Sequence, residues 1–129
     1  MREFVWPCSE DELDVPLNLT SGQVFRWRES SGGEWSGVDG EHVYTLRREA
    51  EGVRVRTTGT PEDFIRLFRL EVSLAAVRSE IVRLGPELAP YANGFSGLRL
   101  MRPSCPREVL FCFLCSANNH ISRITSMVG

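Results

Sequence analysis

The sequence predicts an α+β fold in which an antiparallel β-sheet with packed helices is followed by the first helices of an all-α domain. Between residues 13 and 57, short segments alternate apolar and polar side chains, as half-buried strands do. From residue 60 onward, apolar residues recur at helical spacing. The composition changes at the glycine-containing residues 94–97, which marks a boundary. We therefore predict a sheet-and-helix domain over residues 1–93 and the beginning of a helical domain, truncated, over residues 94–129.

Turn residues separate the expected strands. Asp39-Gly40 predicts a hairpin, because glycine accepts the positive φ of a tight turn. Gly52 marks the next turn. The expected strands are residues 25–28, 35–38, 43–46 and 53–57.

Helix-capping residues begin the second half of the chain. Thr60 is suited to cap a helix whose first turn contains Pro61. Ser73 is suited to cap a second helix that runs to about Leu84 and ends at Gly85.

Two further helices are expected near the end of the sequence. Pro106 begins a helix that is apolar on nearly every side, so we expect it at the centre of a core. Residues 121–128 place apolar side chains on one helical face. Two such helices at the end of the chain indicate a helical domain that continues.

Charge is unevenly distributed over the chain. The net charge is −2, which does not by itself indicate a nucleic-acid-binding protein. Residues 1–93 carry a net charge of −5, whereas residues 94–129 carry a net charge of +3. Binding to phosphate requires local positive charge, so residues 94–129 are the better candidate for a DNA contact, unless the pattern is due to chance.

Neither export nor metal binding is indicated. No apolar run approaches the roughly 20 residues that span a bilayer, and the first residues lack the apolar core of a signal peptide. We therefore expect a cytosolic or nuclear protein with reduced thiols. Cys112, Cys115 and His120 have a spacing reminiscent of zinc sites, but a fourth ligand is missing and both cysteines lie in an apolar segment. We expect no metal and no cofactor.

Two motifs carry a family resemblance. Residues 21–27 read Ser-Gly-Gln-Val-Phe-Arg-Trp, and residues 115–124 read Cys-Ser-Ala-Asn-Asn-His-Ile-Ser-Arg-Ile. Together with the segments between them, in the same order over roughly residues 10–129, they resemble the N-terminal part of the 8-oxoguanine DNA glycosylase/AP lyase family. The resemblance implies a TATA-binding-protein-like N-terminal domain followed by the start of a helix-hairpin-helix domain.

The resemblance also implies a function in base-excision repair. Such an enzyme binds double-stranded DNA, flips out an 8-oxoguanine paired with cytosine, cleaves its N-glycosidic bond and opens the sugar by β-elimination. We expect a monomer when complete, without membrane contact. Its place would be the nucleoid-associated cytoplasm of a prokaryote or the nucleus of a eukaryote.

Gly22 is the candidate for recognition of the damaged base. Guanine N7 accepts a hydrogen bond, whereas N7 of 8-oxoguanine carries a proton and donates one. The resemblance implies that the Gly22 carbonyl accepts from this N7-H, and a glycine allows the backbone to approach a base closely. Such a carbonyl would leave normal guanine without a partner, a strong basis for discrimination. Without the surrounding motif, Gly22 would be interpreted as a turn glycine.

Asn118, Asn119 and Arg123 are the candidates for the opposite side of the base pair. The resemblance implies that Asn118 fills the gap left by the flipped base and that Arg123 bonds the orphaned cytosine. Asn119 is the weaker assignment, and His120 departs from the asparagine often found there. On their own, the two asparagines would be interpreted as a helix cap or turn.

No catalytic residue is assigned. All 15 basic residues are arginine, so the lysine that forms the Schiff base in the family is missing, as is the family's catalytic aspartate. We therefore expect these 129 residues to be inactive by themselves. The alternative is a standalone, non-catalytic DNA-binding or regulatory module.

Overall fold

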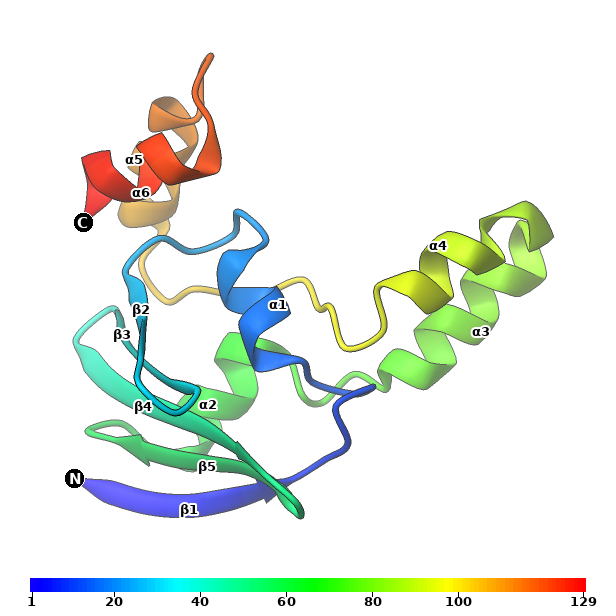
Figure 1. Ribbon diagram of the computed structural model, residues 1–129, viewed down its shortest axis with the longest axis horizontal. Helices are drawn as coiled ribbons and strands as arrows, with labels where there is room; N and C mark the ends of the chain where they lie inside the picture. The colour runs from blue at the N-terminus through cyan, green and yellow to red at the C-terminus, as the bar shows by residue number, and fades with distance from the viewer.

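A single five-stranded antiparallel sheet is the centre of the computed structural model, which describes residues 1–129 (Figure 1). The strand order is β1-β5-β4-β3-β2. The strands are β1 (Arg2–Pro7), β2 (Trp27–Ser30), β3 (Glu34–Asp39), β4 (His42–Glu49) and β5 (Gly52–Thr57). The helices are α1 (Val15–Thr20), α2 (Pro61–Phe68), α3 (Leu74–Leu84), α4 (Ala89–Gly94), α5 (Pro106–Cys115) and α6 (Ile121–Val128), with a 3-10 turn η1 (Pro86–Leu88). The predicted α+β class is confirmed.

The start of the expected sheet region is helical instead. Asp14 accepts a hydrogen bond from the Leu17 amide at 2.9 Å and so caps α1, whose first turn contains Pro16. The sheet contains a further strand, β1, which was not predicted from the sequence and which pairs antiparallel with β5. Its neighbour in the sheet lies some fifty residues away, so nothing in the local sequence announces the pairing.

The predicted strand at residues 25–28 begins two residues later than expected. Trp27 is the first residue of β2, which continues to Ser30 because Glu29 and Ser30 pair with β3. Phe25 leaves the sheet and packs against the helices at the other end of the chain. Phe25 and Trp27 are both buried, as the alternation predicts, but Phe25 belongs to a different core from Trp27.

The main core lies between one face of the sheet and helices α1 and α2. Strands β4 and β5 supply fully buried side chains, and α2 adds Phe64, Leu67 and Phe68. Phe64 packs edge-on against Phe4 of β1 with ring centroids 5.9 Å apart. Each such buried side chain stabilises the fold by roughly 1.5–3 kcal/mol. The other members of this core are Leu13, Val15, Leu19, Trp27, Trp35, Tyr44, Leu46, Val53 and Val55.

Helices α3 and α4 form an arm that extends away from the sheet (Figure 1). Ser73 caps α3 through the Ala76 amide, and the helix ends at Leu84, as predicted. None of its residues is buried. The arm is joined to the sheet domain at the base of α3, where the Glu12 carboxylate accepts from the amides of Leu74 and Ala75, each at 3.1 Å.

Helices α5 and α6 form a second, small core with Phe25. Its buried members are Phe25, Cys112 and Ile124. The expectation that residues 106–115 lie at the centre of a core is wrong for these 129 residues, because Phe111 and Phe113 are 65% and 71% exposed. The helix is apolar on nearly every side, but its buried residue is Cys112, which packs with Phe25 and Ile124 of α6. None of the helices combines the length and apolar character needed to cross a membrane.

Candidate nucleic-acid interface

The fold brings the two sequence motifs into contact. Gly22 has a φ of +89°, a conformation that L side chains rarely adopt. A methyl group placed on its Cα would lie 3.4 Å from Cδ1 of Ile121, the first residue of α6. Gly22 and the start of α6 are therefore neighbours, although about a hundred residues separate them in sequence.

Two further contacts fasten this junction. Phe25, three residues after Gly22, lies in the small core with Ile124 of α6. Arg26 forms an ion pair with Glu108 of α5 at 3.1 Å. This pair is partly exposed, so the apolar contact of Phe25 contributes more to holding the junction together.

The two asparagines occupy the turn between α5 and α6. Asn118 is exposed and has a φ of +55°, a left-handed conformation that asparagine tolerates better than most residues. The Asn119 side-chain amide donates to the carbonyl oxygens of Cys115 and Ala117 at 2.8 and 3.1 Å. Asn119 thus closes the end of α5, whereas the Asn118 side chain forms no hydrogen bond within the chain.

Arg123 and His120 face solvent at the start of α6. Arg123 is the third residue of the helix, is exposed and forms no ion pair. His120 is the N-cap residue, but its side chain makes no capping hydrogen bond. The guanidinium of Arg123 is therefore free to bind an external acceptor.

The positive charge of residues 94–129 is smaller at the surface than the sequence indicates. Arg102, Arg107 and Arg123 are exposed, but Arg99 is only 6% exposed. Because Arg99 is buried and paired within the protein, it cannot serve as a phosphate contact.

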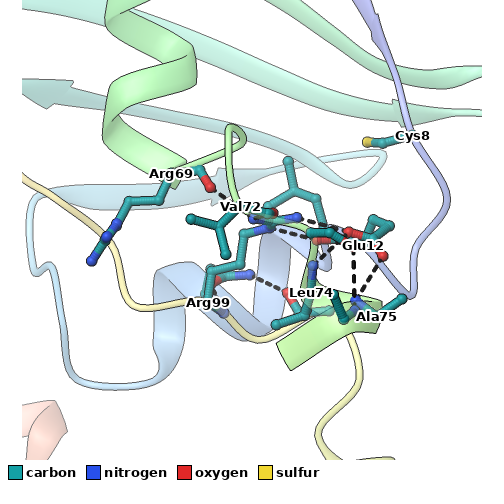
Figure 2. A network of polar contacts seen from close by, with 12 residues as sticks. Cys8, Glu12, Arg69, Val72, Leu74, Ala75 and Arg99 are labelled. Atoms are coloured by element: carbon teal, nitrogen blue, oxygen red, sulfur yellow. Dashed lines mark hydrogen bonds and ion pairs between the residues drawn. The ribbon is translucent and has the colours of Figure 1, made fainter. Parts of the chain in front are cut away.

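Arg99 instead joins three segments of the chain (Figure 2). Its guanidinium donates to the carbonyls of Arg69 and Val72, both at 2.8 Å, and to the Glu12 carbonyl at 2.6 Å. It also pairs with the Glu12 carboxylate at 2.9 Å. Burial lowers the pKa of the Arg99 guanidinium, while Glu12 opposes the shift.

Two side-chain amides fix the segment that contains Arg99. Asn18 donates to the Gly97 carbonyl at 2.7 Å and accepts from the Arg99 amide at 2.8 Å. Gln23 donates to the Arg99 carbonyl at 2.7 Å and accepts from the Met101 amide at 2.8 Å. No role was predicted for these residues from the sequence. A signal was present for Asn18, a polar residue on the buried stripe of α1.

A family model for the N-terminal domain of 8-oxoguanine DNA glycosylase matches residues 5–110. The chain belongs to this family. The family resemblance inferred from the sequence is thereby confirmed.

Individual relatives of the chain agree with the family match. The chain is 34% identical over 133 residues to N-glycosylase/DNA lyase OGG1 of Arabidopsis thaliana. The alignment covers 97% of the chain and 36% of that relative. The solved structure of MBOgg1 in complex with a low-affinity DNA ligand matches with a TM-score of 0.79 at 23% identity, over 97% of the chain and 46% of that protein. This second likeness shows the fold.

A bacterial structure is similar as well. The Clostridium acetobutylicum 8-oxoguanine glycosylase/lyase, in complex with double-stranded DNA that contains cytosine opposite 8-oxoguanine, matches with a TM-score of 0.73 at 28% identity. The match covers 90% of the chain and 38% of that protein. The chain thus spans less than half the length of each of these three relatives.

The chain has no side-chain cluster suited to hold a metal ion. No group of three or more His, Cys, Asp or Glu residues has the required proximity. All four cysteines are free, and burial raises the pKa of the Cys112 thiol. Cys112 behaves as a small apolar core residue.

Proposed function

We propose that this chain forms the part of a bifunctional 8-oxoguanine DNA glycosylase/AP lyase that contacts the damaged base pair. The observation that carries the proposal is the close approach of Gly22 to Ile121, which brings the candidate base-recognition turn beside the helix start that bears the candidates for the opposite strand. The parent reaction would remove 8-oxoguanine opposite cytosine and then cleave the strand by β-elimination. The glycosylase/lyase relatives do not favour the alternative of a non-catalytic module.

Gly22 is proposed to recognise the damaged base. None of the hydrogen bonds within the chain uses its carbonyl oxygen, so this acceptor is available for the N7-H of 8-oxoguanine. Normal guanine presents an acceptor at the same position, and two facing acceptors repel each other. An unmatched buried polar group of this kind costs about 1–3 kcal/mol.

Asn118 and Arg123 are proposed to contact the strand opposite the lesion. Both side chains are exposed and unpaired, close in sequence to Ile121. Asn118 would occupy the gap left by the flipped base, and Arg123 would donate to the acceptor atoms of the orphaned cytosine. For Asn119 we propose a supporting role, since its amide bonds hold the turn that presents Asn118.

The catalytic groups are not assigned to these residues. The sequence contains no lysine through which a Schiff base could form. We propose that residues 94–129 belong to a helical DNA-glycosylase domain and that residues 1–93 form the sheet domain beside it. Activity on genomic DNA would place the protein in the nucleoid-associated cytoplasm of a prokaryote or in a eukaryotic nucleus, as a monomer.

The test is an electrophoretic shift assay with the full-length protein and two duplexes that differ only in 8-oxoguanine:C or G:C. We expect tighter binding to the damaged duplex. Gly22→Ala should reduce this preference, since alanine is strained at a φ of +89°. Asn118→Ala and Arg123→Ala should weaken the preference for cytosine opposite the lesion.

An exposed arginine outside the proposed interface, Arg83, serves as the control for this assay. Arg83→Ala removes a surface charge from α3 and should leave both preferences unchanged. Equal affinity of the unmodified protein for the two duplexes would contradict the proposed function.

A further inference from the structure

We propose that Gln23 is a positioning residue that fixes the direction of the Gly22 carbonyl and so determines discrimination against normal guanine. This inference rests on the proposed function. It deepens that function by assigning the selectivity to a side chain whose carboxamide is bonded within the protein.

The Gln23 carboxamide is fully engaged. Its Nε2 donates to the Arg99 carbonyl at 2.7 Å and to the Ser21 hydroxyl at 3.1 Å, and its Oε1 accepts from the Met101 amide at 2.8 Å. A carbonyl and an amide two residues apart are the groups that a neighbouring β-strand would use. Gln23 therefore binds residues 99–101 as a strand would.

Asn18 binds the same segment on the other side of the turn. Its side chain pairs with the Gly97 carbonyl and the Arg99 amide. Ser21 links the Gln23 carboxamide to the backbone of α1, because its hydroxyl donates to the main-chain carbonyl of Asn18 at 3.0 Å and accepts from Gln23 Nε2. Gly22 thus lies in the chain between Asn18 and Gln23, whose side chains both bind residues 97–101.

The segment itself is firmly placed. Arg99 lies between the two attachment points, and its buried guanidinium bonds Glu12 and the carbonyls of Arg69 and Val72 (Figure 2). Gln23 therefore fixes the position of the Gly22 carbonyl relative to the loop between α2 and α3, whose carbonyls at Arg69 and Val72 bind Arg99.

Glycine is the residue that needs such external support. The absence of a side chain permits the φ of +89°, but it also leaves the peptide free to rotate toward other conformations. A carbonyl that can rotate away no longer repels N7 of guanine. Loss of the Gln23 bonds should therefore weaken discrimination more than it weakens binding of the damaged duplex.

The experiment compares Gln23→Glu and Gln23→Met with the unmodified full-length protein. Glutamate keeps the shape but cannot donate to the Arg99 carbonyl, and methionine keeps the length without polar atoms. The measured quantity is the ratio of the Kd for the G:C duplex to the Kd for the 8-oxoguanine:C duplex. We expect this ratio to fall about fivefold or more in both variants, of the order expected from losing one or two buried hydrogen bonds.

A matched control separates positioning from stability. Thr60→Ala removes the cap of α2 at a site outside this network and should lower Tm by a few degrees while leaving the ratio unchanged. If the Gln23 variants do not fold, Ser21→Ala tests the same network, because it removes the link between the Gln23 carboxamide and the main-chain carbonyl of Asn18. It should also lower the ratio.

The outcomes distinguish the two proposals. A ratio that stays at the unmodified value in the Gln23 variants, or in Ser21→Ala where those do not fold, overturns the positioning role and leaves the proposed function intact. A ratio of one in the unmodified protein overturns the proposed function and this inference with it. A fall that Thr60→Ala reproduces assigns the effect to stability and also overturns the positioning role.

Discussion

Arg99 and Arg83 each form an ion pair with a glutamate, but their surroundings differ. The Arg83 side chain is 66% exposed and contacts Glu80 on the surface of α3. The Arg99 side chain is 5% exposed and satisfies three carbonyls besides the Glu12 carboxylate. Water can replace the partners of Arg83, whereas the groups around Arg99 would be left without donors.

Truncation of these two arginines should therefore have very different effects. We expect Arg99→Ala to lower the free energy of unfolding by about 3 kcal/mol or more, because it leaves buried acceptors unpaired. Arg83→Ala should cost at most about 0.5 kcal/mol. Urea unfolding followed by circular dichroism measures both, and similar losses would show that the Arg99 network is not a stabilising connection.

Among the elements, α2 is specified most completely by its own sequence. The Thr60 hydroxyl accepts from the Asp63 amide, and the Asp63 carboxylate accepts from the Thr60 amide at 2.9 Å, which together form a capping box. Opposite the cap, Phe64, Leu67 and Phe68 supply the buried face. Hydrogen bonds from Thr60 hold the pKa of Asp63 below its usual value, with help from His42 and Arg66.

The capping box should make stability depend on pH at this helix. A carboxyl whose pKa is lowered by folding stabilises the protein at any pH above its pKa in the unfolded state. That stability is lost as the pH falls through the pKa of the folded state. Asp63→Asn should cost about 1 kcal/mol at pH 7. The difference from the unmodified protein should shrink as the pH drops below about 4 in urea unfolding series. A difference that does not depend on pH would contradict the role of the charge.

At the scale of the whole molecule, the sheet domain is well packed whereas the α5–α6 pair leaves much apolar surface uncovered. Phe111, Phe113 and Leu114 are all more than half exposed. Large exposed apolar patches on a soluble protein tend to become interfaces or to cause aggregation. A polypeptide of these 129 residues alone should therefore associate through α5.

Charge introduced into that surface should suppress the association. We expect Phe111→Glu with Phe113→Glu to lower the average mass of the 129-residue polypeptide in concentration-dependent light scattering. Ser31→Glu adds a charge in the exposed loop between β2 and β3 and serves as the control, with no change in mass expected. Association that persists in the double variant would assign it to another surface.

The candidate site was only partly visible in the sequence. Gly22, Asn118 and Arg123 stand in motifs whose residue types and order can be recognised without coordinates, and their roles remain predictions. Asn18, Gln23 and Arg99 act through partners about 76 to 87 residues away in sequence or through backbone carbonyls, so no local pattern reveals them. The proximity of Gly22 to Ile121 could likewise not be predicted from the sequence, because the two residues lie far apart along the chain.

The elements that could be predicted are those with local signals in the sequence: the caps at Thr60 and Ser73, the end of α3 before Gly85 and the turn at Gly40. The pairing of β1 with β5 at one edge of the sheet, and the packing of Phe25 against α5 and α6, become visible in the folded chain. The physical reason is the range of the interactions. Caps and turns are satisfied within about four residues, whereas strand pairing and core packing depend on which distant segments the folded chain brings together.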